Sequence, residues 1–358
     1  MAIEAFLGTR PQKAFLFTVI LQAVLVLAVV GVIYGKVSDN IPAKQVPTIP
    51  CYLALFALAE VFETIITVDA LKLRNTIQLI GILLFHSAMI IMSALQIYQT
   101  KEALVTQPGA DCATNYATCD GPDSLWAFVL RLLIVIPIIL ALALMVLIWV
   151  TRALFLEFGW AVFHAIGADP KMKVMYQYYQ IMICLLKFDF FCFTGVTMQL
   201  LILVLTSHRA EFVITIVAIP VVLVLLFICG LALQREWTFL MVISLCLMVA
   251  AETYFIYKIC RVFEPSTAYR YVAVRGSLTT FLIVAAVLLL ATFAVGIRCF
   301  ADFGRGLRKS KMKGLPLDPS HPEQQRTQKL GAPDVGTPGM SEQGVGTGGR
   351  VQRTFSIE

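Results

Sequence analysis

The sequence predicts an all-α fold, a polytopic transmembrane helical bundle with a disordered C-terminal tail. Of its 358 residues, 59% are hydrophobic and only 14% are charged, whereas a soluble domain usually carries about 25% charged residues. The apolar residues are grouped in long runs, and a helix of about 20 apolar residues crosses a ~30 Å hydrocarbon core. Because lipid offers the backbone no water, each run must close its own hydrogen bonds as a helix.

Eight runs are long enough to span a bilayer. Three carboxylates, Glu60, Glu63 and Asp69, interrupt the second run, and Lys187 and Asp189 interrupt the fifth. A seven-span alternative therefore stays open, in which one interrupted run is re-entrant or lies outside the membrane. The predicted spans are about 14–34, 51–70, 77–98, 126–150, 178–205, 211–233, 237–257 and 278–299.

The chain divides into a transmembrane helical domain, 1–306, and a cytoplasmic tail, 307–358. The tail is rich in Gly, Pro, Ser and Gln, so it cannot bury enough apolar surface to offset its ordering entropy. With both termini in the cytoplasm, fourteen Lys and Arg residues lie on the cytoplasmic side and eight on the opposite side. This distribution follows the positive-inside rule. Basic residues at 305–313 could bind anionic lipid headgroups, or they could merely fix the topology.

Two cysteines stand apart from those in the apolar runs. Cys112 and Cys119 flank a polar hexapeptide in the connection between the third and fourth spans. The predicted orientation places this connection on the non-cytoplasmic side, where oxidation is favoured. We expect a Cys112–Cys119 disulfide; two free thiols are the alternative.

Ionisable residues inside a bilayer cost roughly 2.5–3.5 kcal/mol each at its centre, so they are the candidate functional residues. Glu60 and Glu63, three residues apart, share one helix face. Lys187 and Asp189, two apart, point away from each other. We therefore expect Lys187 to pair with Glu60 or Glu63, and Asp189 to find another donor or a water. The intramembrane candidates are Glu60, Glu63, His86, Lys187, Asp189 and Glu252.

These residues allow two interpretations. In the first, they surround a cavity and form an ion- or proton-coupled translocation site. In the second, they are interhelical pairs that fix helix packing, each contributing about 1 kcal/mol or less. The spacing of the residues is specific to neither interpretation.

The connection that follows the fourth span is rich in aromatic residues. Residues 152–166 are predicted as a helix lying at the membrane interface, ended by Gly167 and the Asp169-Pro170 pair. The alternative is a cytoplasmic extension of the fourth span.

Motifs of soluble enzymes, such as G-x-S-x-G, a Walker loop or H-E-x-x-H, do not occur in the sequence. We therefore expect no catalytic residues, no cofactor and no metal site. Nucleic-acid binding has no support beyond one short basic stretch.

Three sequence elements carry a resemblance to a known family: GWAVFHAIGAD, LLKFDFF and FEPSTAYRY. With their surroundings, the chain resembles an uncharacterised family of fungal Golgi apparatus multi-pass membrane proteins, over roughly 300 residues. The resemblance implies Golgi residence but no activity. It also draws attention to Glu264, Tyr269 and Arg270, which could build a small lumenal site or could cap and orient the last span.

We expect a non-enzymatic Golgi membrane protein that serves membrane organisation, sorting or trafficking. The tail and the aromatic segment would contact protein partners, whose identity the sequence does not give. The alternative is an ion- or proton-coupled transporter of a small solute that uses Glu60, Glu63, Lys187 and Asp189.

Overall fold

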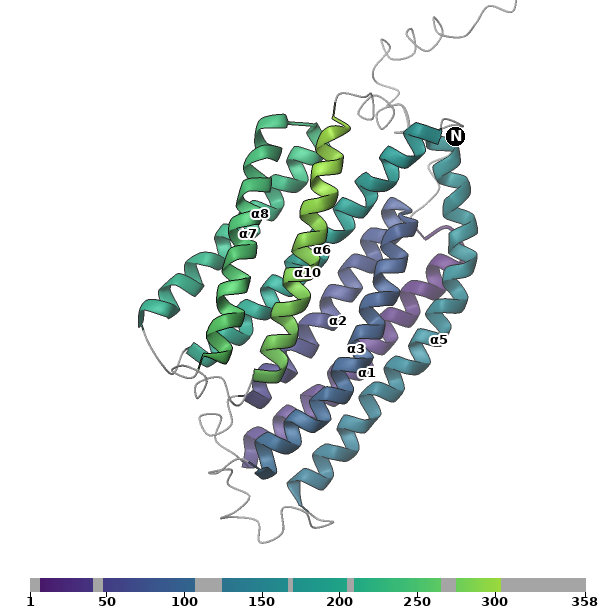
Figure 1. The fold of residues 1–358 in the computed structure, drawn as a ribbon. Helices are drawn as coiled ribbons and strands as arrows, with labels where there is room; N and C mark the ends of the chain where they lie inside the picture. The colour runs from purple at the N-terminus through teal and green to yellow at the C-terminus, as the bar shows by residue number, and fades with distance from the viewer. Residues whose placement is uncertain are drawn as a thin grey trace, which may run out of the picture. The chain divides into compact units, whose positions relative to one another are not determined.

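The computed structural model describes residues 7–40, 48–106, 124–166, 170–204, 209–264 and 275–303. Every regular element within these ranges is helical (Figure 1), which confirms the all-α class. The helical part belongs to one compact unit, Met1–Leu315, and the second unit, Pro316–Glu358, lies outside the described residues. The predicted tail and the exact domain boundary therefore stay predictions.

The described residues form eight α-helices and one short π-helical segment. The first four α-helices are α1 (Arg10–Asn40), α2 (Thr48–Leu73), α3 (Thr76–Lys101) and α5 (Leu125–Ile166). The π-helical segment η1 (Glu102–Thr106) extends α3. The remaining four are α6 (Pro170–Val204), α7 (Arg209–Arg235), α8 (Thr238–Phe263) and α10 (Arg275–Ala301).

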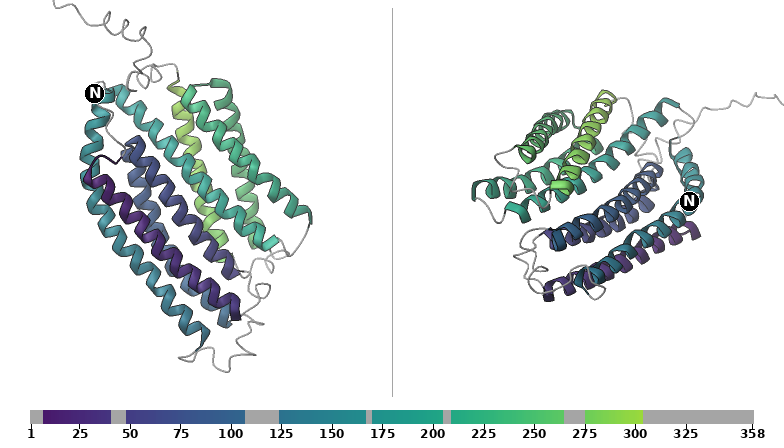
Figure 2. Two further views of the ribbon diagram at one scale, coloured as in Figure 1. Left: turned by 180° about the vertical axis from the view of Figure 1, so that it is seen from behind. Right: turned by 60° about the horizontal axis from the view of Figure 1, so that its bottom comes forward.

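These helices pack as two groups of four. In the first group, α1 packs against α2 and α5, and α3 packs against the same two helices. In the second group, α6 and α8 each pack against α7 and α10. The groups meet where α6 packs against α2 and α3, and both views in Figure 2 show this division. Because α2 and α6 lie at the junction, their apolar segments are the most buried of the predicted spans.

The outer surface of these helices is apolar. Large side chains such as Met145, Trp149 and Phe239 are more than 70% exposed. Exposed apolar surface on this scale is a liability in water, but it is the expected face of a helix in lipid. The protein is therefore a multi-pass membrane protein, and the solvent of its outer surface is a lipid bilayer.

Seven of the described helices are long and apolar enough to cross a membrane. They include α2 and α6, so the charged residues do not prevent either run from forming a long helix. Helix α7 has 27 residues, but the side chains of 209–219 lie outside the described part, and the remaining part, Pro220–Arg235, is shorter than a span. The choice between seven and eight spans thus depends on the sixth run, not on the second or fifth.

The fourth span and the segment after it form one helix. Helix α5 contains 42 residues, about 63 Å at 1.5 Å per residue, which is about twice the hydrocarbon thickness. The prediction of a separate interfacial helix at 152–166 is wrong, and the alternative extension of the fourth span is what forms. Pro170 then opens α6, because a first helical position needs no backbone N–H donor.

A tight turn joins α2 to α3 and brings their polar ends together. Arg74 adopts a positive φ of 50°, which reverses the chain within two residues. The Asn75 side chain then caps α3 by accepting hydrogen bonds from the backbone N–H groups of Ile77 and Gln78, at 3.0 and 3.2 Å. The cap fixes the start of α3, and with it the register of α3 against α2.

Candidate functional site: three polar clusters between helices

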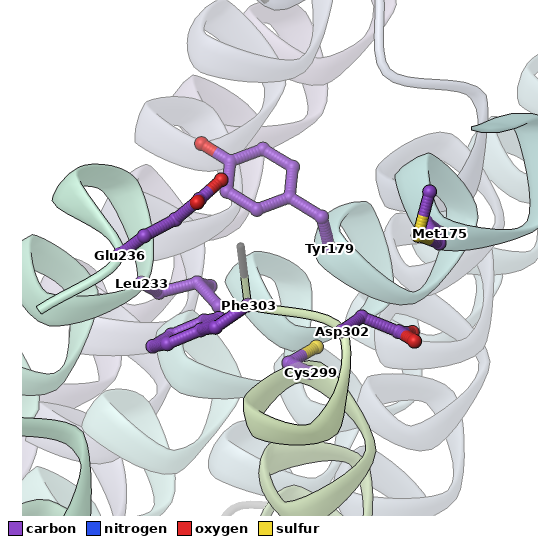
Figure 3. Close-up of a pocket in the computed structure, with 7 residues that line it drawn as sticks. All are labelled: Met175, Tyr179, Leu233, Glu236, Cys299, Asp302 and Phe303. Atoms are coloured by element: carbon purple, nitrogen blue, oxygen red, sulfur yellow. The ribbon is translucent and has the colours of Figure 1, made fainter. Parts of the chain in front are cut away.

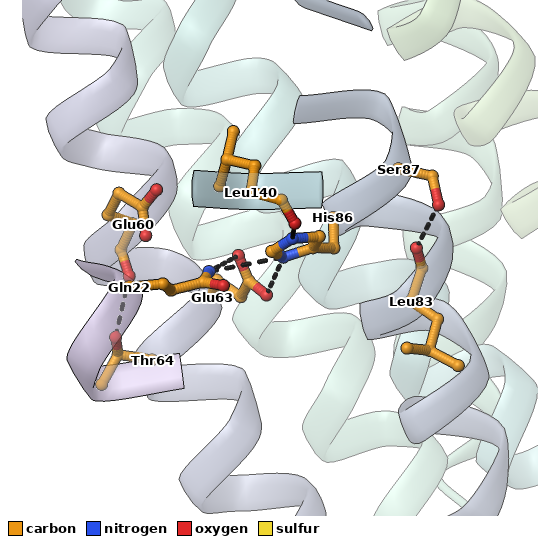
Figure 4. A network of polar contacts seen from close by, with 8 residues as sticks. All are labelled: Gln22, Glu60, Glu63, Thr64, Leu83, His86, Ser87 and Leu140. Atoms are coloured by element: carbon orange, nitrogen blue, oxygen red, sulfur yellow. Dashed lines mark hydrogen bonds and ion pairs between the residues drawn. The ribbon is translucent and has the colours of Figure 1, made fainter. Parts of the chain in front are cut away.

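The first cluster contains Gln22, Glu60, Glu63 and His86, and we call it the Glu63 cluster (Figure 4). His86 Nδ1 lies 2.8 Å from Glu63 Oε1, and Gln22 Nε2 donates to Glu63 Oε2 at 3.1 Å. The other ring nitrogen of His86 lies 2.9 Å from the carbonyl oxygen of Leu140. The contacts therefore connect α1, α2, α3 and α5, the whole first group of helices.

The geometry of His86 specifies where protons lie. A carbonyl oxygen only accepts hydrogen bonds, so His86 Nε2 carries a proton and donates it to Leu140. The contact between His86 Nδ1 and Glu63 then holds one further proton, on the carboxyl or on the ring. The pair is neutral overall in either arrangement. This neutrality explains how Glu63 and His86 can both be completely buried.

Glu60 is the exception within this cluster. It is completely buried, and neither oxygen of its carboxyl makes a close hydrogen bond among the described residues, although the Gln22 side chain is near enough to interact with it. The carboxyl interacts electrostatically with Glu63 and His86. The predicted shared face of Glu60 and Glu63 is present, since both point into the first group of helices.

The second cluster contains Asp69, Gln78 and Lys187, and we call it the Lys187 cluster. Lys187 Nζ contacts Asp69 Oδ2 and donates to Gln78 Oε1 at 2.8 Å. Gln78 Nε2 in turn donates to Asp69 Oδ2 at 3.0 Å. These contacts connect α6 to α2 and α3 at the junction of the two groups, and the side chains of Lys187 and Asp69 are 27% and 37% exposed.

The expected partner of Lys187 was wrong. Lys187 pairs with Asp69, rather than with Glu60 or Glu63. Helix α6 begins at Pro170, eight residues before the predicted start of the fifth span. Lys187 lies at the level of Asp69, near the α2–α3 turn, rather than beside the Glu63 cluster.

The third cluster contains Asp189, Glu252 and Thr292, and we call it the Asp189 cluster. The Thr292 hydroxyl donates to Asp189 Oδ2 at 2.5 Å and joins α10 to α6. Asp189 is 5% exposed, and Glu252 of α8 is close enough to interact electrostatically with it. The donor predicted for Asp189 is therefore a threonine hydroxyl, and Asp189 and Lys187 make no contact that the structure records.

The lumenal candidates are only partly described. Glu264 forms an ion pair with Arg261 at 2.8 Å, three residues earlier at the end of α8. Tyr269 and Arg270 lie outside the described residues, as do Cys112 and Cys119. The disulfide and the lumenal site stay predictions.

Four residues of these clusters were not among the candidates from the sequence: Gln22, Asp69, Gln78 and Thr292. Asp69 was noted only as one of the carboxylates that interrupt the second run. Gln22 carries a usable signal, because it is the one amide within the apolar run 14–34. Gln78 gives no clear signal in the sequence, because it lies at the start of a helix, where polar residues are common. A single threonine such as Thr292 gives no signal, since its hydroxyl can bond to its own helix, and it also bonds to Leu288.

Two further observations limit the chemistry of the described residues. They contain no group of three or more His, Cys, Asp or Glu side chains placed to hold a metal ion. A pocket lined by Tyr179, Glu236 and Asp302 (Figure 3) has a volume of about 10 Å³, which is about the space of one water molecule. It cannot take an organic substrate.

Comparison with known proteins identifies a relative. The UPF0658 Golgi apparatus membrane protein of the yeast Schizosaccharomyces pombe is 29% identical over 327 residues, covering 86% of this chain and 92% of the relative. The chain is a homologue of this UPF0658 protein. The resemblance read from the sequence is thereby confirmed, and the UPF0658 name denotes an uncharacterised family. No family model and no solved structure matches the chain.

Proposed function

We propose that the protein is a non-enzymatic multi-pass Golgi membrane protein that serves membrane organisation, sorting or trafficking. Golgi residence is supported by the name of the UPF0658 homologue, with which the chain aligns over most of its length. The proposed role assigns the intramembrane polar residues to helix packing and leaves recognition to the surfaces of the molecule.

One observation carries this proposal: two of the three completely buried ionisable groups bond to each other across helices. Glu63 and His86 are completely buried and connect all four helices of the first group, with Gln22 and the Leu140 carbonyl. A group that binds a substrate needs an open path to solvent or to lipid. A closed and neutral pair is the arrangement that a packing contact requires.

The proposal includes an orientation and partners. Both termini lie in the cytoplasm, because more of the Lys and Arg residues fall on that side. The tail, 307–358, contacts other proteins, and the basic stretch 305–313 lies near anionic headgroups of the cytoplasmic leaflet. An even number of crossings supports this orientation, since the ends of α1 and α10 that lead to the termini lie at the same end of the bundle (Figure 1).

A second candidate function is proton- or ion-coupled transport of a small solute. Glu60 favours it, because its completely buried carboxyl makes no close hydrogen bond in the described residues and could receive a proton or a cation. The partly exposed Lys187–Asp69 pair would then lie on the path.

Substitution of Lys187 separates the two candidates. Lys187→Met removes the contacts of α6 with Asp69 and Gln78, and a loss of 1–2 kcal/mol of stability lowers cellular abundance several-fold. We expect lower abundance of the tagged, full-length protein and an unchanged Golgi lumenal pH, measured with a lumenal ratiometric sensor. Lys173→Met is the matched control, because Lys173 lies on the same helix and is exposed; it should leave both readouts unchanged.

The opposite result would support the transport function. If Lys187→Met accumulates to the normal level while the lumenal pH or ion content shifts, Lys187 acts in transport and the packing role is wrong. Lys187→Arg keeps the charge and should restore abundance if the contact with Asp69 is what matters.

A further inference from the structure

A long groove follows the junction between the two groups of helices. Its volume is about 740 Å³, within the ~300–1,000 Å³ range of ligand sites. Residues of α3 and α10 form its two sides, and residues of α2 and α6 complete its wall. Along α3 the lining runs from Ile77 to Gln99, which is about 33 Å and matches the thickness of a bilayer core.

Most of the groove is apolar. Phe56 and Ala59 of α2 and Phe191 of α6 line it and are less than 8% exposed, so they form its deep part. Leu84 and Val287, from α3 and α10, also line it but are more than 60% exposed, so they form its open rim. Since lipid surrounds this surface, hydrocarbon can enter the groove from the side.

One end of the groove is polar. Tyr52 and Ser277 lie near the starts of α2 and α10, and Gln96 and Gln99 lie near the end of α3. The Ser277 hydroxyl donates to Gln199 Oε1 of α6 at 3.1 Å. Because these helix ends lie on one side of the bundle, the polar groups mark the membrane interface at that end.

At this end of the groove, the side chain of Gln96 has a hydrogen-bond acceptor without a partner in the described residues. It is 3% exposed, and its side-chain oxygen has no hydrogen-bond partner in the described part of the chain. The Nε2 group of Gln199, a completely buried residue, is likewise without a partner there. An unpartnered buried amide costs about 1–3 kcal/mol, so a ligand that supplied the missing partner would gain that stabilisation.

We infer that this groove binds a single long-chain lipid with an uncharged head that carries hydroxyl or amide groups. Its hydrocarbon chain lies along α3 and α10, and its head donates to Gln96. None of the side chains that line the groove carries a charge, so the lining offers nothing to neutralise a phosphate. The inference rests on the proposed function and deepens it by naming a ligand class.

A helix from a second protein fits this groove less well. A transmembrane helix satisfies its own backbone and would bring apolar side chains to the polar end as well as to the rest. The Gln96 oxygen would then stay without a partner. A lipid head at the interface supplies a donor at that level and a chain below it.

The test uses the full-length protein in phosphatidylcholine nanodiscs with two photoactivatable, clickable probes of equal chain length. One is a ceramide, which is neutral and carries amide and hydroxyl groups; the other is an anionic phosphatidic acid. We expect the ceramide probe to label peptides from 80–99 and 277–288 saturably. Unlabelled ceramide should compete, and the phosphatidic acid probe should give only unsaturable labelling.

Substitutions of groove residues test whether the lipid binds in the groove. Gln96→Leu removes the amide and should weaken the apparent affinity about fivefold, the value of one net hydrogen bond. Val284→Phe places a ring in the groove, where Val284 is 44% exposed, and should abolish saturable labelling. Val24→Phe is the matched control on α1, because Val24 is 59% exposed and does not line the groove.

Three results would overturn the inference: equal labelling by both probes, saturable labelling that neither Gln96→Leu nor Val284→Phe changes, or crosslinks between two copies of the chain through these residues. The first indicates ordinary surrounding lipid, the second indicates a saturable site outside the groove, and the third indicates a dimer interface. Mass spectrometry of the recovered ceramide keeps this inference separate from the proposed function. Unchanged lipid agrees with a non-enzymatic role, whereas converted lipid would refute that role and leave the site in place.

Discussion

The contact between Glu63 and His86 gives the sharpest prediction about stability. Glu63→Ala would remove the acceptor of Gln22 and the partner of His86 Nδ1, at 3.1 and 2.8 Å. Each buried group left without a partner costs about 1–3 kcal/mol, so the variant, which leaves two such groups, should lose roughly 2–6 kcal/mol of unfolding free energy. Contacts between membrane helices average about 0.6 kcal/mol, with a maximum near 1.7, so the coupling between Glu63 and His86 should be about 1 kcal/mol.

A double-mutant cycle measures this coupling. The wild type, Glu63→Ala, His86→Ala and the double variant are unfolded reversibly in detergent micelles, and the unfolding free energies are compared. The exposed Arg261–Glu264 pair at the end of α8 is the internal control, and its cycle should give no more than about 0.5 kcal/mol. If the losses for Glu63 and His86 simply add, the contact contributes no stability and the reasoning is refuted.

Three further predictions concern helix packing, the junction and the disulfide. A Cβ at Gly195 of α6 would lie 2.8 Å from the Phe281 ring of α10, so Gly195→Ala should lower the thermal midpoint. Gly31→Ala meets nothing within 4 Å and should leave the midpoint unchanged or raise it. Gln78→Leu breaks two of the contacts in the Lys187 cluster and should reduce abundance as Lys187→Met does; normal abundance would show that the cluster does not stabilise the junction. A Cys112–Cys119 disulfide should produce a shift in electrophoretic mobility on reduction. The shift should be absent when both cysteines have been alkylated in a reduced sample. Free thiols at both positions in the native protein would exclude the disulfide.

The sequence was sufficient to predict the helices, but not to predict which helices lie next to one another. Apolar length alone predicted α2 and α6 despite Glu63 and Lys187, because a helix carries single charges when a neighbouring helix pairs them. For the sixth run, 211–233, the described side chains begin at Pro220, so a full span there stays a prediction. Hydropathy measures transfer to lipid, and it contains no information about which helix lies next to which.

The Lys187 cluster shows where reasoning from the sequence failed. The partner of Lys187 depends on the depth of α6 relative to α2, and in the structure the lysine lies beside Asp69. The sequence rightly excluded a Lys187–Asp189 pair, because residues two apart lie on different helix faces. Spacing within a helix could thus be predicted, but depth relative to another helix required the three-dimensional structure.

The account depends on the Glu63 cluster being closed to water, and one measurement tests this directly. Thr67 is completely buried on α2, one turn from Glu63. Thr67→Cys is treated in membranes with a water-soluble methanethiosulfonate reagent, and modification of that peptide is quantified by mass spectrometry, with the exposed Cys260 as the internal reference. A packing cluster predicts no modification at position 67 under conditions that modify Cys260. Rapid modification at position 67 from either side of the membrane would reveal an aqueous path to Glu63 and contradict the packing role.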